Sequence, residues 1–197
     1  LATKGQAGGI TVSTLAEAEY FARAGFTDIL YGVGITPDKL AGVSAVQALG
    51  AEVILILDNP DTARLVVERA GAQGGACRFL IEIDCGQHRT GLLPDDPRVL
   101  ECARIIVEGT NCELRGVMTH AGHSYDCDTT DAARVVAEDE RAAVVAAAET
   151  LRGAGVPCPI VSVGSTPTAL HAEHLDGVTE MRPGVYMFGD LFQHSIG

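Results

Sequence analysis

The sequence lacks several features that would assign it to a protein class at once. Only 14 of its 197 residues are Lys or Arg, against 26 Asp or Glu, so the formal net charge is −12. A protein that binds a phosphate backbone needs clustered positive charge, and none is present, which excludes a nucleic-acid partner. No apolar run approaches the roughly 18–20 residues that span a bilayer, and no signal-peptide pattern opens the chain. We therefore expect no membrane partner.

Low-complexity tracts are also missing, and 47% of the residues are hydrophobic, which excludes a disordered chain and predicts one buried core. The six cysteines include no C-x-x-C pair. Such scattered cysteines indicate reduced, mostly buried thiols rather than a disulfide framework, and this predicts a cytoplasmic location.

Seven short apolar, β-branched runs are predicted to be strands. They are Gly9–Ser13, Asp28–Tyr31, Glu52–Leu57, Arg78–Asp84, Leu114–His120, Ile160–Val163 and Val178–Arg182. Near-continuous apolar strands are typical of a parallel sheet that is covered on both faces.

Helical patterns fill the gaps between these runs. The expected helices are Leu15–Gly25 after a capping Thr14, Pro37–Leu49, Asp61–Ala70, Pro97–Glu108, Thr130–Gly153 and Thr168–His174. The alternation predicts an α/β fold with right-handed crossovers, either a (β/α)8 barrel or an open doubly wound sheet. Seven strands are one fewer than a closed barrel has, so either the sheet is open or one strand lies outside this chain.

Polar, glycine-rich segments follow four of the predicted strands, and this is the end where parallel barrels carry their functional groups. In the segment 83–91, Arg89 can present its guanidinium to an anionic ligand, or it is a surface cation paired with Asp84. The segment 119–125 carries two histidines and a tyrosine. They form an acid/base cluster, an aromatic lid or, less well supported, a metal site. The alternative is a strand-capping histidine, which fits His123 better than His120.

The third segment, Val163–Thr168, runs straight into an expected helix, so its backbone N–H groups and hydroxyls favour phosphate over a plain N-cap. The fourth, Glu180–Asp190, contains Gly184, which lets a ligand approach the backbone, next to Arg182. The alternative for Arg182 is a solvated side chain at a tight turn. Together the four segments predict a small anionic ligand. The remaining histidines are expected to be solvent-exposed: His171, His174 and His194.

The motifs IDCGQHRTG, THAGHSY, VSVGSTPT and EMRPGVYMFGD, with GITVSTLAEAEYFARAGFTDILYG near the start, occur in this order along the chain. On these residues the chain resembles the barrel domain of the fold-type III pyridoxal-phosphate enzymes, which include alanine racemase. Within that group the D-threonine aldolase and D-serine dehydratase branch fits best. The resemblance spans essentially the whole chain and implies an alanine-racemase-type TIM barrel that lacks its first strand.

The resemblance also implies which residues bind the cofactor's phosphate. Ser165 and Thr166 match the phosphate-binding hydroxyls, and Gly184 and Val185 match the backbone N–H donors. Tyr186 is expected to belong to the same cofactor-binding group.

Other matching residues are expected at the cofactor's ring. Arg89 matches the arginine that approaches the phenolic oxygen, and His120 matches the histidine beside the pyridine ring. Arg182 falls where alanine racemase has the arginine at the ring nitrogen. That contact keeps the nitrogen unprotonated and favours racemase-like chemistry. His120 and Tyr125 are the expected catalytic residues.

The chain departs from the family pattern in two respects. The family's Schiff-base lysine sits on a first strand that would precede Gly9, and the only lysines, Lys4 and Lys39, do not match it. The C-terminal β-domain, which carries the metal ligands, is also missing. We therefore expect residues 1–197 to be a partial pyridoxal-phosphate-binding barrel, with the first strand and the β-domain outside this chain.

The resemblance implies a lyase that acts on D-3-hydroxy amino acids through an external aldimine, by aldol cleavage or dehydration. It further implies a homodimer and a divalent metal, zinc or manganese, with no metal ligand in this chain. The alternatives are an amino-acid racemase and a non-catalytic pyridoxal-phosphate carrier. From the residues alone, a phosphosugar-binding barrel also stays open.

Overall fold

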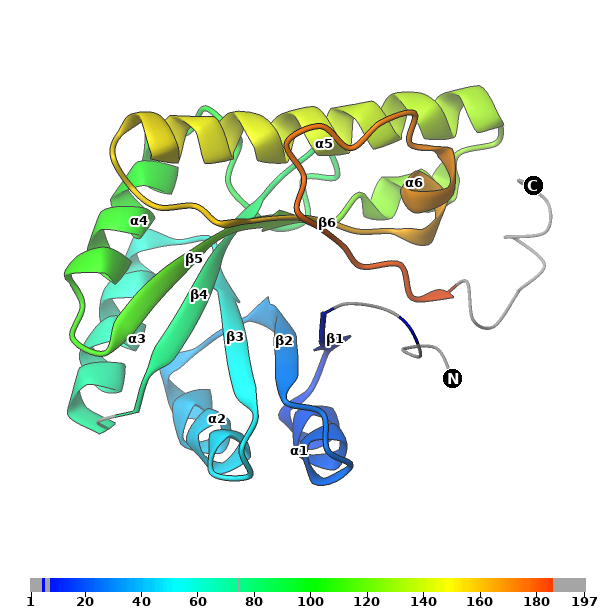
Figure 1. The fold of residues 1–197 in the computed structure, drawn as a ribbon. Coiled ribbons are helices and arrows are strands. Elements are labelled where there is room, and N and C mark those ends of the chain that lie inside the picture. The colour runs from blue at the N-terminus through cyan, green and yellow to red at the C-terminus, as the bar shows by residue number, and fades with distance from the viewer. Residues whose placement is uncertain (1–4, 6–7, 74, 186–197) are drawn as a thin grey trace. The chain divides into compact units, whose positions relative to one another are not determined.

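The computed structural model describes Gly5, residues 8–73 and residues 75–185 (Figure 1). Its seven strands follow one another in the sheet in chain order. They are β1 (Ile10–Val12), β2 (Asp28–Gly34), β3 (Glu52–Leu57), β4 (Cys77–Ile83), β5 (Cys112–Thr119), β6 (Ile160–Val163) and β7 (Glu180–Met181). Each of the seven predicted strands is therefore found, which confirms the α/β class.

Helices separate the strands along the chain. They are α1 (Leu15–Arg23), α2 (Leu40–Gln47), α3 (Pro60–Gln73), α4 (Pro97–Glu108), α5 (Thr130–Gly153) and α6 (Thr166–His171), with the 3-10 helices η1 (Pro37–Lys39) and η2 (Gly122–Asp126). Contacts group the chain into two compact units. Unit 1 comprises Leu1–Ile81 and Leu100–Arg115, and unit 2 comprises Glu82–Val99 and Gly116–Gly197.

Unit 1 contains the parallel strands β1 to β3 and most of β4. The central strand β3 is buried at five consecutive positions, Val53 to Leu57, so both of its faces are covered. Helix α1 begins where the sequence predicts. Thr14 accepts a hydrogen bond from the backbone of Glu17 at 3.1 Å, and the Glu17 carboxylate accepts one from the Thr14 N–H at 3.0 Å. This reciprocal pair satisfies two N–H groups that the helix leaves without partners.

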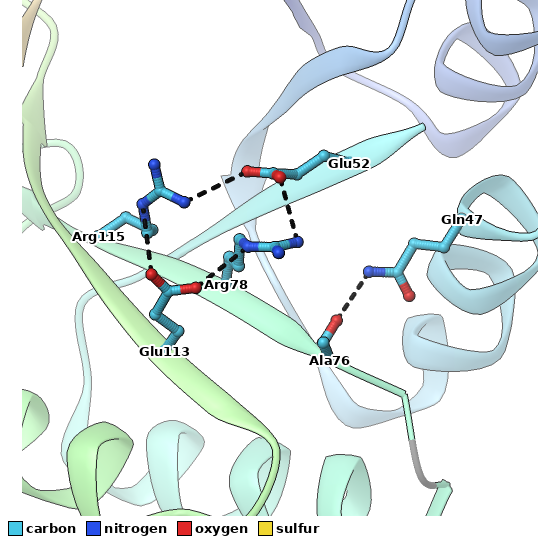
Figure 2. A network of polar contacts seen from close by, with 6 residues as sticks. All are labelled: Gln47, Glu52, Ala76, Arg78, Glu113 and Arg115. Atoms are coloured by element: carbon cyan, nitrogen blue, oxygen red, sulfur yellow. Dashed lines mark hydrogen bonds and ion pairs between the residues drawn. The ribbon is translucent and has the colours of Figure 1, made fainter. Parts of the chain in front are cut away.

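A ring of four charged side chains joins strand beginnings in unit 1 (Figure 2). Arg78 contacts Glu52 at 3.3 Å and Glu113 at 3.1 Å, and Arg115 contacts the same two carboxylates at 3.5 and 3.7 Å. The ring has no net charge, and its members are 27–54% exposed. Solvent screens such pairs, so we assign the ring to strand alignment rather than to ligand binding.

Unit 2 contains the second half of β5 with β6 and β7, again parallel, with Gly116 opposite Ile160 and Ser162 opposite Glu180. The long helix α5 packs on β6 and on α6 (Figure 1). Its buried face carries mainly small apolar residues, which lets the helix lie close to the strands.

Several predicted elements have different bounds in the structure, among them the following three. The expected helix 37–49 is split, because residues 37–39 form the 3-10 helix η1 before α2 begins. The expected helix 168–174 begins at Thr166, because the Ser165 side chain caps it by accepting from the Thr168 N–H. The expected strand 178–182 is reduced to Glu180–Met181.

The structure also tests the predictions about membrane spans and cysteines. Among the described residues no helix is long and apolar enough to cross a membrane. All six cysteines are unpaired, and four of them are buried, as predicted: Cys77, Cys102, Cys127 and Cys158.

The approach of β5 to β6 gives a stability prediction. A Cβ atom at Gly116, where φ is +142°, would lie 1.9 Å from the carbonyl oxygen of Ile160. We expect Gly116→Ala to lower the free energy of unfolding by about 3 kcal/mol or more, through backbone strain and overpacking. Gly153→Ala is the matched control, because open space surrounds its Cβ position at the end of α5. It should leave stability unchanged or raise it by up to about 1 kcal/mol. Urea denaturation measures both, and equal effects would contradict the strand approach described here.

Candidate functional site

A closed loop follows β4 and carries Arg89. Its geometry is set by Asp84, whose Oδ1 accepts hydrogen bonds from the N–H groups of Gly86 at 2.9 Å and His88 at 3.0 Å. The other oxygen, Oδ2, lies 2.7 Å from Nδ1 of His88. Burial raises the pKa of Asp84, but the hydrogen bonds from Gly86 and His88 outweigh it and lower the pKa overall. Asp84 is therefore a carboxylate that fixes the loop.

The base of the same loop is held by backbone pairing with residue 92. The N–H of Asp84 donates to the Leu92 carbonyl at 2.8 Å, and the N–H of Leu92 donates to the Glu82 carbonyl at 3.0 Å. Gly91 is required here, because at φ +93° a Cβ would lie 2.6 Å from the Asp84 nitrogen. Arg89 is exposed at the loop tip, and within the described part of the chain it has no hydrogen bond or ion pair. The partner of Asp84 is His88, so the pairing of Arg89 with Asp84 that the sequence left open is wrong.

His120 follows β5 and is half-buried. Burial is the largest cause that lowers its pKa, and the charge of Arg182 lowers it further, whereas a backbone hydrogen bond with Gly164 opposes the shift. Its imidazole is therefore neutral at pH 7. His123 lies in η2 instead of at the strand end, and its buried Nδ1 has no hydrogen-bond partner among the described residues. It is not the satisfied strand-capping histidine that the sequence left as an alternative.

The segment after β6 holds a buried chain of hydroxyl groups. The hydroxyl of Ser165 lies 2.8 Å from that of Ser124 and 2.7 Å from that of Thr168, and the residue is only 2% exposed. In the structure Ser165 thus supports the loop and caps α6. Its predicted contact with a phosphate stays a prediction.

Thr166 links the segment after β6 to the segments after β5 and β7. Its hydroxyl accepts from the N–H of Val185 at 3.1 Å, and its own N–H donates to the hydroxyl of Tyr125 at 3.4 Å. Gly184 is exposed, and open space surrounds the position that a Cβ would take. Tyr186 lies outside the described residues. The structure therefore brings together Tyr125, Thr166 and Val185 from the predicted set.

Arg182 comes directly after β7, and its side chain is 10% exposed. Its Nε donates to the Ser162 hydroxyl at 2.8 Å, and its Nη2 donates to the Thr119 carbonyl. The guanidinium packs against Gly164, where a Cβ would lie 3.1 Å from Cζ. Burial lowers the pKa of Arg182, and Glu180 has the largest effect among the carboxylates that oppose this. An arginine nevertheless stays charged at pH 7. The alternative of a solvated side chain is therefore wrong.

Several residues of this site were not found from the sequence. Ser162 and Glu180 hold Arg182, and the buried Glu140 of α5 accepts hydrogen bonds from two of the loops. A signal for Glu140 exists, because a lone carboxylate interrupts the buried, alanine-rich face of α5.

The other histidines and lysines lie elsewhere. His174 is exposed as predicted, between Glu138 at 3.4 Å and Asp176 at 3.3 Å. His171 is only half-exposed and its Nε2 is buried, so the prediction of exposure is wrong for it. His194 and Lys4 lie outside the described residues, and Lys39 in unit 1 donates to the Tyr31 hydroxyl at 2.9 Å. In the described part of the chain, no group of three His, Cys, Asp or Glu side chains is arranged to hold a metal ion.

The donor set of unit 2 fits a phosphorylated aromatic ligand. The Thr166 hydroxyl and the Val185 N–H form a hydrogen bond next to the exposed Gly184 in the chain, and both are groups that can donate to an anion. The neutral His120 ring offers a flat surface, and Arg182 supplies a fixed cation next to it. Hydroxyl and amide donors for a phosphate, together with a neutral ring and a fixed cation, are groups that pyridoxal phosphate can use.

Comparison with known proteins gives close matches. The model of the alanine racemase N-terminal domain matches residues 1–191. A D-threo-3-hydroxyaspartate dehydratase from Delftia sp. (strain HT23) is 50% identical over 192 residues, which are 97% of this chain and 50% of that protein. Its solved structure matches with a TM-score of 0.94 at 50% identity, over 98% of this chain and 51% of that chain. A mutant of that enzyme has been solved in a metal-free form.

Two more distant proteins match over the same stretch. A D-serine dehydratase from Dictyostelium discoideum is 30% identical over 200 residues, 96% of this chain and 50% of that protein. The structure of a D-threonine aldolase from Filomicrobium marinum covers 98% of this chain and 52% of that chain. Its TM-score of 0.85 at 24% identity supports the fold alone. The chain thus spans about half the length of the relatives it matches. These matches confirm the predicted fold and resemblance: the chain belongs to the alanine racemase N-terminal domain family of the fold-type III pyridoxal-phosphate enzymes.

Proposed function

We propose that this chain is the cofactor-binding barrel part of a pyridoxal-phosphate-dependent lyase that acts on D-3-hydroxy amino acids. The observation that carries the proposal is the set of hydrogen bonds that joins the ends of β5, β6 and β7 through Arg182 and Thr166. The 50% identity with the Delftia dehydratase supports the choice of a lyase.

The residues of unit 2 have separate tasks in this proposal. The Thr166 hydroxyl and the N–H groups of Gly184 and Val185 hold the phosphate, with Ser165 beneath them. His120 would offer its neutral ring to the pyridine, and the positive charge of Arg182 would keep the ring nitrogen unprotonated. Pyridoxal phosphate, when bound, supplies an electron sink for the bonds at the amino acid's Cα.

Three further residues complete the proposed site. Arg89, exposed on the loop after β4, would approach the phenolic oxygen. Tyr125, whose hydroxyl already contacts the Thr166 N–H, acts with His120 in proton transfer. Tyr186 also belongs to the cofactor-binding group in this proposal.

The proposal also includes a lysine and a metal that residues 1–197 do not provide. The Schiff-base lysine sits on a first strand and a β-domain carries a divalent metal, zinc or manganese, both outside residues 1–197. The metal-free form described for the Delftia mutant supports a metal in that relative, and such an ion would help hydroxide to leave. We propose a homodimer in the cytoplasm that acts on small D-amino acids.

A racemase is the second candidate, because a specific residue favours it. By the resemblance, Arg182 corresponds to the arginine of alanine racemase. Its positive charge would keep the ring nitrogen unprotonated and so weaken the ring as an electron sink. The relatives at 30% identity or more named above are dehydratases, which favours the lyase.

A product assay separates these activities. We expect the full-length protein to convert D-threo-3-hydroxyaspartate or D-serine to a 2-oxo acid and ammonia, and a chelator to reduce the rate at least about tenfold. Glycine with an aldehyde would instead indicate aldol cleavage, and the L-enantiomer would indicate a racemase. Cofactor binding without any turnover would indicate a carrier protein, and the absence of cofactor absorbance near the visible edge would contradict the whole proposal.

The pKa of His120 gives a pH prediction. The folded protein holds this pKa below its ordinary value of 6.5, so the unfolded chain binds the extra proton more readily. The contribution of His120 to stability is therefore complete above pH 6.5 and is lost as the pH falls below it. Thermal melting of the cofactor-free protein should show Tm falling less steeply with decreasing pH in His120→Gln than in the wild type. Parallel curves would contradict a neutral, desolvated His120.

A further inference from the structure

Glu140 is the one charged residue on the buried face of α5. It is 2% exposed, and its neighbours on that face include Ala137 one turn before it and Val144 one turn after it. A carboxylate at such a position is costly unless its oxygens are satisfied by donors. The contacts of Glu140 therefore indicate why the residue is there.

Three donors, two from loops and one from α6, converge on this carboxylate. Its Oε1 accepts from the N–H of Ala121 at 2.8 Å and from the N–H of Gly164 at 3.2 Å. Its Oε2 accepts from the Thr168 hydroxyl at 2.7 Å. An ionised carboxylate accepts and does not donate, so the three contacts match its chemistry.

The two N–H groups belong to residues next to the predicted cofactor ligands. Ala121 follows His120, and Gly164 precedes the Ser165–Thr166 pair. Gly164 also packs against the Arg182 guanidinium. Through Thr168 the carboxylate additionally reaches the hydroxyl of Ser165, 2.7 Å further on. Glu140 thus contacts both loops through residues that neighbour the predicted cofactor ligands.

We propose that Glu140 is a positioning residue. Its hydrogen bonds fix the loop of His120 relative to the loop of Thr166. The residue expected at the cofactor's ring and the residue expected at its phosphate are thereby held in one site. The effect on the cofactor rests on the proposed function, whereas the joining of the two loops does not. The negative charge of Glu140 also raises the pKa of Arg182, against the effect of burial, which is consistent with a role behind the site.

Three substitutions test the geometry. Glu140→Ala removes all three acceptors, and Glu140→Asp draws the carboxylate back by one methylene so that it cannot reach every donor. Glu140→Gln keeps Oε1 for the two N–H groups, and its amide can donate to the Thr168 hydroxyl, so it should rescue the arrangement. Val144→Ala is the matched control, because it removes packing from the same helix face without any hydrogen bond.

Hydrogen exchange of the cofactor-free, full-length protein is the first readout. In Glu140→Ala we expect exchange to rise at least about tenfold in both segments 119–124 and 162–168, because hydrogen bonds to a charged group are lost. If that variant does not fold, Glu140→Asp should show the same pattern. In Glu140→Gln and Val144→Ala the exchange rates of both segments should stay within about threefold of the wild type. In both variants the N–H groups of Ala121 and Gly164 keep Oε1 of residue 140 as their acceptor.

The affinity for pyridoxal phosphate is the second readout. Glu140→Ala or Glu140→Asp should weaken binding at least about tenfold, with Glu140→Gln and Val144→Ala close to the wild type. Unchanged exchange in the two segments, a rise confined to α5, or the same rise in Val144→Ala would overturn the positioning role. Wild-type protein that does not bind the cofactor would refute the proposed function, while the exchange data would still decide whether Glu140 joins the loops.

Discussion

The buried guanidinium of Arg182 is the constraint on which the site depends. One side chain after β7 donates to the Thr119 carbonyl at the end of β5 and to the Ser162 hydroxyl of β6. A buried cation is tolerated only with acceptors and counter-charges nearby, and here Glu180 supplies the nearest charge. Strand ends that are far apart in the sequence are therefore held in one arrangement, which fixes where the neighbouring loops begin.

The same cation explains the state of His120. Burial and the positive charge of Arg182 both lower its pKa, so a neutral ring and a fixed cation stand beside each other. This combination suits a flat ligand with a phosphate group and an unprotonated ring nitrogen. The chain spans only about half the length of its relatives. A shared barrel does not determine the reaction, and this one is compatible with dehydration, aldol cleavage or racemisation.

The sequence predicted the strands well, because buried parallel strands such as Val53–Leu57 are continuously apolar. It also placed Thr166 and Val185 after the correct strands, and Arg182 at the end of the last one. It could not predict that Ser165 points into a hydroxyl network, since capping and anion binding use the same residue types. It also missed Glu140, because the three partners of this residue lie 19, 24 and 28 positions away along the chain, and only the folded structure brings them together.

The most direct test is a crystal structure of the full-length protein with pyridoxal phosphate bound. The account predicts phosphate oxygens within hydrogen-bonding distance of the Thr166 hydroxyl and the Val185 N–H, with the His120 ring against the pyridine and Arg182 at its nitrogen. A phosphate bound away from the segments after β6 and β7, or an Arg182 turned to solvent, would contradict it.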